Sequence, residues 1–269
     1  MIETFYNNDK TKSFDITIPE VNILGLWFSG GIESSLLLYL LAKLIQDNKL
    51  DIKIQPATMC LSDIDKDEKP SISKKLELSL AMIENYTTAR TIAPNICNIV
   101  TEILDTNCIL PLKKYFPISS VWKEYVDKER ENYENKTWDV LYSGRNALPP
   151  EEVHGGKEKW PNLVKPHMIN PVGHEGIFWK IRDPNVIQEE VFKFSKNIVD
   201  SDQSGTYWQL FVPFANIDKK FIANLYEQFD LLDTLLPTTK SCSFVPLEEL
   251  VGCGKCFHCM EKYYGFGVY

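Results

Sequence analysis

The stretch that decides the fold reads Val21-Asn-Ile-Leu-Gly-Leu-Trp-Phe28, followed at once by Ser29-Gly-Gly-Ile-Glu-Ser-Ser35. The first part is mostly apolar and predicts a buried strand that ends at the glycine pair. From Ile32 to Gln46 the chain contains neither Gly nor Pro, which predicts a long and mostly buried helix. A strand, a glycine turn and a helix in direct succession are typical of an α/β sheet.

Strands and helices are expected to alternate along the rest of the chain. We predict strands at Phe14–Ile18, Ile52–Leu61, Asn98–Leu104, Thr137–Tyr142 and Trp208–Phe214, and helices at Ser71–Tyr86, Val121–Asn135 and Lys219–Phe229, the last capped by Asp218. This alternation predicts an α/β fold with a doubly wound parallel sheet in three layers. The proline-rich stretch 147–205 interrupts the pattern and is interpreted as a lid, a substrate loop or an insertion, with a surface decoration as the alternative.

Composition sets outer limits on the function. The chain has 269 residues and a formal net charge of −8, with 29 basic and 37 acidic residues, which argues against nonspecific nucleic-acid binding. The longest apolar run, Leu36–Ile45, is too short to span a bilayer, and the polar N-terminus does not resemble a signal peptide. We therefore expect a cytoplasmic protein without a membrane partner, and a homodimer stays open.

The glycine loop has the composition of an anion site. Adjacent Gly30 and Gly31 allow backbone N–H groups to converge, and the dipole of the following helix adds to the field that they create. The hydroxyls of Ser29, Ser34 and Ser35 supply further donors. The loop matches neither the Walker pattern nor the GxGxxG fingerprint. The alternative is a tight turn in which the glycines serve geometry alone.

A second motif lies near the C-terminus, where four of the seven cysteines gather. Their spacing is Cys-x10-Cys-x2-Cys-x2-Cys, formed by Cys242, Cys253, Cys256 and Cys259. Thiolates spaced in this way predict a closed, structural zinc site with four sulfur ligands. His258 in place of one cysteine, an iron–sulfur cluster and unligated thiols are the alternatives.

The pattern Ser-Gly-Gly-x-acid-Ser after an apolar strand resembles the signature of the PP-loop ATP pyrophosphatases. Glu33 stands where that superfamily usually has Asp. The resemblance implies an adenine-nucleotide α-hydrolase-like fold in which Ser29, Gly30, Gly31, Glu33, Ser34 and Ser35 hold ATP and Mg²⁺.

Together with the cysteines, three further pieces are similar to the 7-cyano-7-deazaguanine synthases of queuosine-precursor biosynthesis. They are Ser143-Gly-Arg-Asn146, Asp218-Lys-Lys220 and Leu236-Pro-Thr-Thr-Lys-Ser-Cys242. The chain departs from that family at Leu61–Glu68 and in the length of the stretch 147–205.

The resemblance implies an ATP-dependent C–N ligase that forms AMP and pyrophosphate. Such an enzyme adenylates 7-carboxy-7-deazaguanine and aminates it with ammonia toward an amide or the nitrile. Arg145 and Lys219 would neutralise phosphate or carboxylate charge, or else are surface cations. Asn146 would read a base or fix its loop, and His154, His167 and His174 are candidate acids or bases.

The same reasoning predicts two units, an ATP-binding domain over 1–236 with the insertion at about 147–205, and a zinc lobe with bound Zn²⁺ over 237–269. Two other functions remain open. One is modification of a macromolecular acceptor, such as a protein, a tRNA or DNA, which the altered segment Leu61–Glu68 suggests. The other is a nucleotide-binding or interaction module without catalysis.

Overall fold

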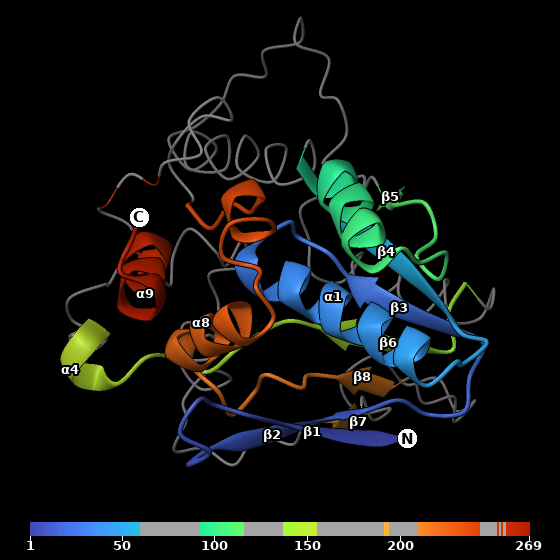
Figure 1. Cartoon of the computed structure of the whole chain (residues 1–269), viewed down its shortest axis with the longest axis horizontal. Coiled ribbons are helices and arrows are strands. Elements are labelled where there is room, and N and C mark those ends of the chain that lie inside the picture. Colours follow the sequence, from blue (N-terminus) through green and yellow to red (C-terminus); the bar gives the residue numbers. More distant parts are fainter. Residues whose placement is uncertain are drawn as a thin grey trace, which may run out of the picture.

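The fold is of the α/β class, and its centre is a mixed sheet of six described strands, five of them parallel (Figure 1). The computed structural model describes residues 1–59, 92–115, 137–154, 191–193, 209–242, 252, 254 and 257–269. Across the sheet the strands are β5 (Lys113–Tyr115), β4 (Lys53–Met59), β3 (Ile23–Trp27), β6 (Val140–Ser143), β8 (Gln209–Phe211) and β7 (Val191–Lys193). Only β7 runs antiparallel to its neighbour. The predicted α/β class with a parallel sheet is therefore confirmed.

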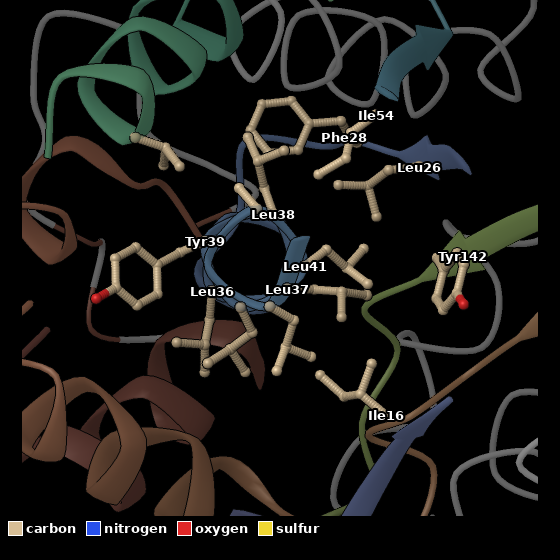
Figure 2. Close-up of a cluster of buried hydrophobic side chains, with 14 of the residues drawn as sticks. Ile16, Leu26, Phe28, Leu36, Leu37, Leu38, Tyr39, Leu41, Ile54 and Tyr142 are labelled. Carbon is tan, nitrogen blue, oxygen red and sulfur yellow. The ribbon is translucent and has the colours of Figure 1, made fainter. Parts of the chain in front are cut away.

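Helix α1 (Ile32–Asp47) follows the central strand β3 and fills the core on one face of the sheet. Six of its sixteen residues are leucines, and all six are almost fully buried. Figure 2 looks along α1 and shows Leu37 and Leu41 pointing toward Tyr142 of β6. Burial of this many large apolar side chains gives α1 stability that its sequence alone would not provide.

An N-terminal hairpin forms a separate two-stranded sheet from β1 (Ile2–Tyr6) and β2 (Ser13–Thr17). Phe14 is buried and packs edge-on against Phe214 and Phe221, with ring centroids 5.3 and 5.5 Å away. The strand predicted at Phe14–Ile18 is thus present, but it belongs to this hairpin rather than to the edge of the main sheet.

Two helices from the C-terminal part pack against each other, and the first of them also contacts α1. Helix α8 (Lys219–Gln228) is capped by Asp218, whose Oδ1 accepts hydrogen bonds from the backbone N–H groups of Lys220 and Phe221, each at 3.0 Å. The predicted cap is confirmed. A short 3₁₀ helix η1 (Leu236–Thr238) follows, and α9 (Phe257–Phe266) lies across the start of α8 (Figure 1).

The predicted strand at Asn98–Leu104 is wrong, because residues 92–104 form a helix. The buried members of this segment are Ala93, Ile96, Cys97 and Val100. Their separations of three or four residues are those of one helical face, and that face packs into the same core as α1. The β-branched residues around position 100 favoured a strand, and tertiary burial outweighed that preference.

Other predicted elements are shorter than expected or lie outside the described residues. The strand at Trp208–Phe214 is β8 and ends at Phe211, since a turn covers 213–216. Of the insertion 147–205, the structure describes α4 (Glu151–His154) and β7. The helices predicted at 71–86 and 121–135 lie outside the described residues, so the three-layer arrangement stays a prediction. No helix in the described part has the length and apolar character needed to cross a bilayer.

Candidate functional site

The glycine loop occupies the point where the strand order of the sheet reverses direction. Strand β3 is central, β4 lies on one side of it and β6 on the other. The loops after β3 and β6 therefore leave the same edge of the sheet and flank the crevice in which α/β proteins bind ligands. A Cβ atom on Gly144, directly after β6, would lie 2.9 Å from the backbone carbon of Glu33 and the backbone nitrogen of Ser34. The two predicted loops are thus in direct contact.

Inside the loop the serine hydroxyls bond to one another and to the backbone. Gly30 has a φ of 74°, a conformation that glycine adopts without strain. The Gly31 N–H donates to Ser29 Oγ at 3.2 Å, and Ser34 Oγ donates to the Gly31 carbonyl at 3.1 Å. Ser35 Oγ is fully buried and has no hydrogen-bond partner among the described residues. Ser35 Oγ is therefore covered by the protein itself and does not face the open side of the loop.

Lys219 and Glu33 meet at the loop, as an ion pair between Lys219 Nζ and Glu33 Oε1. The exposed fraction of the Lys219 side chain is 3%, and that of Glu33 is 19%. Lysine is seldom buried to this extent unless its charge is compensated. The surface-cation interpretation of Lys219 is therefore wrong, and the residue stands at the glycine loop.

The remaining residues after β6 occupy the same edge. Arg145 is partly buried immediately after Gly144. Asn146 is 3% exposed and donates from Nδ2 to the Ala147 carbonyl at 3.1 Å, which favours a role in fixing the loop. The Ala147 N–H in turn donates to the Ile217 carbonyl at 2.8 Å, so this loop is joined to the turn that precedes α8.

The segment leading to Cys242 also touches the glycine loop, which the sequence reasoning missed. The Lys240 N–H donates to the Gly30 carbonyl at 3.2 Å, and Lys240 is only 8% exposed. Ser241 Oγ is buried and lacks a hydrogen-bond partner within the described ranges. The site therefore gathers buried polar and cationic groups from four separate parts of the chain.

Only part of the predicted zinc site lies within the described residues. Cys242 is partly buried, Cys259 is 1% exposed on α9, and Cys253 and Cys256 lie outside the description. A Cβ on Gly252 would lie 2.7 Å from Cys259 Sγ, so the backbone next to Cys253 folds back onto that thiol, as a metal loop requires. No group of three candidate ligands occurs among the described residues, and the four-cysteine set stays a prediction.

Lys262 connects the two motifs and was not singled out from the sequence. Burial lowers the pKa of Lys262, and the nearby charge of Lys219 lowers it further, whereas Cys259 and Cys242 act in the opposite direction. Lys262 follows Cys259 by one helical turn and precedes Gly265 by another.

His258 is the one histidine whose side chain lies within the described part of the chain, and it is placed on α9. His258 Nδ1 lies 3.4 Å from Glu261 Oε2, and the Glu261 side chain is 1% exposed. His154 is the last residue of α4, while His167 and His174 lie outside the described residues.

A separate hollow lies at the opposite end of α1. It has a volume of about 430 Å³ and is lined by the outer strand of the hairpin, by Lys43 and Asp47 of α1, and by Phe229. None of the residues predicted to bind or react lines it.

Comparison with known proteins adds no relative: no protein-family model matches the chain, and no curated protein is similar to it in sequence. A loop with glycine N–H groups, a helix N-terminus and buried cations is suited to an oligophosphate or another multiply charged anion.

Proposed function

We propose that the protein is an ATP-dependent ligase that activates a carboxylate by adenylation and transfers it to nitrogen. The observation that carries this proposal is the position of the glycine loop at the reversal of strand order, with Lys219 buried beside it. Anionic cofactors bind at this position in α/β sheets because loops from two neighbouring strands open there. The adenine-nucleotide α-hydrolase-like, three-layer form of the fold belongs to the same proposal.

The glycine loop would hold the pyrophosphate end of ATP. Backbone N–H groups of Gly30 and Gly31 and the hydroxyl of Ser34 would donate to phosphate oxygens. Lys219 and Arg145 would balance the negative charge that grows on the leaving pyrophosphate. Glu33 fits Mg²⁺ as a hard oxygen ligand, and bound Mg²⁺ would neutralise phosphate charge.

The reaction follows from the poor reactivity of carboxylates toward nitrogen. A carboxylate oxygen of the substrate attacks the α-phosphorus of ATP, and pyrophosphate leaves. Ammonia then attacks the acyl carbon, AMP leaves with the bonding electron pair, and a proton is lost to give the amide. The amide oxygen then attacks the α-phosphorus of a second ATP and a second pyrophosphate leaves. Loss of AMP and of the two nitrogen-bound protons gives the nitrile. The resemblance to 7-cyano-7-deazaguanine synthases supports 7-carboxy-7-deazaguanine as the substrate.

The four cysteines would hold Zn²⁺ in a structural site that closes the C-terminal lobe over residues 237–269. The fold-back of Gly252 onto Cys259 supports this assignment. Metal analysis of purified protein should give about one zinc per chain. Iron together with visible absorption would instead favour a cluster.

A second candidate is a nucleotide-binding module without turnover. It is favoured by one observation, the engagement of the Glu33 carboxylate by Lys219, which occupies the group that Mg²⁺ would need.

A macromolecular acceptor, such as a protein, a tRNA or DNA, is the variant of the ligase proposal in which the same activation serves another substrate. In each case the protein would work in the cytoplasm.

The decisive experiment measures pyrophosphate release from ATP, with 7-carboxy-7-deazaguanine and ammonia present or omitted in turn. Release that requires both, with a product mass of the amide or the nitrile, supports the synthase. Ser34→Ala serves as the site variant and Lys43→Ala, at the far end of α1, as its matched control. ATP binding without release supports the module, and no ATP binding overturns the proposal.

A further inference from the structure

Helix α9 holds the start of α8 from one side through a hydrogen bond. The Tyr264 hydroxyl donates to Asp218 Oδ2 at 3.1 Å. The other oxygen of the same carboxylate, Oδ1, caps α8 through the backbone N–H groups of Lys220 and Phe221. Asp218 is therefore fixed by both helices, directly before Lys219. Burial raises the pKa of Tyr264, with the Asp218 charge adding to the effect, so the hydroxyl keeps its proton and remains a donor.

The second contact is a close approach of backbones at Gly265. A methyl group at this position would lie 2.6 Å from the Lys219 carbonyl oxygen and 2.7 Å from Lys219 Cγ. Both distances are well inside the contact distance of about 3.5 Å between non-bonded heavy atoms. Gly265 is the second-last residue of α9, and its missing side chain leaves room for this contact. Any side chain at position 265 would collide with Lys219, so glycine allows α9 to pack directly against that residue.

The backbone of Lys219 contacts α9, whereas its side-chain ammonium forms the ion pair with Glu33 at the glycine loop. A lysine side chain has four rotatable bonds, so holding its ammonium at one place requires the stem to be confined. Gly265 and Tyr264 confine the backbone and the first carbons of Lys219, and Glu33 receives the ammonium. The path from α9 to the loop is continuous and runs through described residues alone.

We infer that Tyr264 and Gly265 are positioning residues of the anion site, and that they act by fixing Lys219 at the glycine loop. The inference rests on the proposed function, in which the anion is the pyrophosphate end of ATP. It gives α9 a part in nucleotide binding that is separate from the predicted zinc site at its beginning.

The test measures the binding of inorganic pyrophosphate to the full chain by calorimetry, for wild type, Gly265→Ala, Lys219→Met and the double variant. We expect Gly265→Ala to weaken binding about tenfold and to add no further loss once Lys219 is replaced. A loss that is undiminished in the Lys219→Met background would show a general structural effect and overturn the inference. Wild-type affinity in Gly265→Ala would overturn it as well.

A matched pair on the same helix guards against failure of the glycine variant to fold. Tyr264→Phe removes only the hydroxyl that bonds to Asp218, and we expect binding about threefold weaker. Tyr263→Phe removes a hydroxyl from a residue that is 52% exposed and stacks on Tyr269, and it should bind as wild type does. Equal affinities in the two variants contradict the inference. If wild type binds neither pyrophosphate nor ATP, the proposed function fails with it, whereas normal wild-type binding with unaffected variants refutes the positioning role alone.

Discussion

The two ends of helix α1 lie in different surroundings. Its C-terminal end borders a hollow of about 430 Å³, where two of the charged lining groups, Lys43 and Asp47, form a half-exposed ion pair at 2.9 Å. Its N-terminal end gathers Glu33, Ser35 and the almost fully buried Lys219. Volume is the prominent feature at one end and convergence of buried polar groups at the other. Burying a charged group costs free energy of folding unless the group is paired, and perturbed charged groups cluster at functional sites. The N-terminal end is therefore the better candidate for chemistry.

The strongest test of this contrast is Gly144→Ala, which places a methyl group against the backbone of Glu33 and Ser34. Backbone atoms in the first turn of a buried helix cannot yield easily, so we expect a loss of about 3 kcal/mol in the free energy of unfolding. ATP affinity should fall strongly as well. Urea unfolding and calorimetric titration measure the two effects. A stable variant with wild-type ATP affinity would show that the loops after β3 and β6 do not form one site.

A second change separates the two partners of the ion pair at the N-terminal end. Glu33→Gln leaves the Lys219 ammonium buried without the carboxylate, and we expect a loss of about 2 kcal/mol, less than for a fully buried pair because Glu33 is partly exposed. Metal-free pyrophosphate should then raise the melting temperature of the variant more than that of wild type. Equal shifts would mean that the anion does not meet Lys219.

A third test concerns the core beside α1, away from both ends. Burial raises the pKa of the Cys97 thiol from 9.0 to about 12. Below pH 9 the thiol is neutral in the folded and the unfolded chain and contributes no pH dependence. Above pH 9 only the unfolded chain ionises, so the free energy of unfolding falls as pH rises, by about 1 kcal/mol between pH 8 and pH 10 for this group.

Cys97→Ala is the matched variant for this pH dependence. Urea unfolding at pH 8 and pH 10 should show a smaller decrease for Cys97→Ala than for wild type. Parallel decreases would place the alkaline loss in other groups, such as Cys108, whose pKa burial also raises.

The smallest effect is expected at the C-terminal end of α1. Lys43→Ala removes a surface ion pair of the i, i+4 type, which typically contributes about 0.3 kcal/mol. Stability and ATP affinity should both stay within error of wild type. A clear loss of ATP affinity would move the nucleotide to the hollow at that end and reverse the comparison.

The features that the sequence predicted well are local ones. The glycine turn, the buried helix after it and the Asp218 cap each depend on a few neighbouring residues. Gly-Gly permits the turn, an unbroken apolar run fills the helix, and an aspartate accepts from the next N–H groups.

The features that were missed depend on residues far apart in the chain. The Lys240 N–H meets the Gly30 carbonyl, and Gly265 rests on Lys219, but neither contact has a signature at one position. The error at 98–104 has another cause. A strand and a helix were both compatible with its apolar residues, and only the period of burial over 92–104 distinguishes the two.

The pairing of β3 with β6 also governs how the chain reaches its folded state. Leu24 pairs with Val140, and Glu33 meets Lys219 across 186 positions of sequence. Contacts between such distant segments form late, because a long loop must close before any of them gains stability. During synthesis α1 therefore leaves the ribosome before β6 and α8, two of the elements that contribute to its core, exist. We expect the nascent chain to need chaperone protection until the segment from residue 209 onward has emerged.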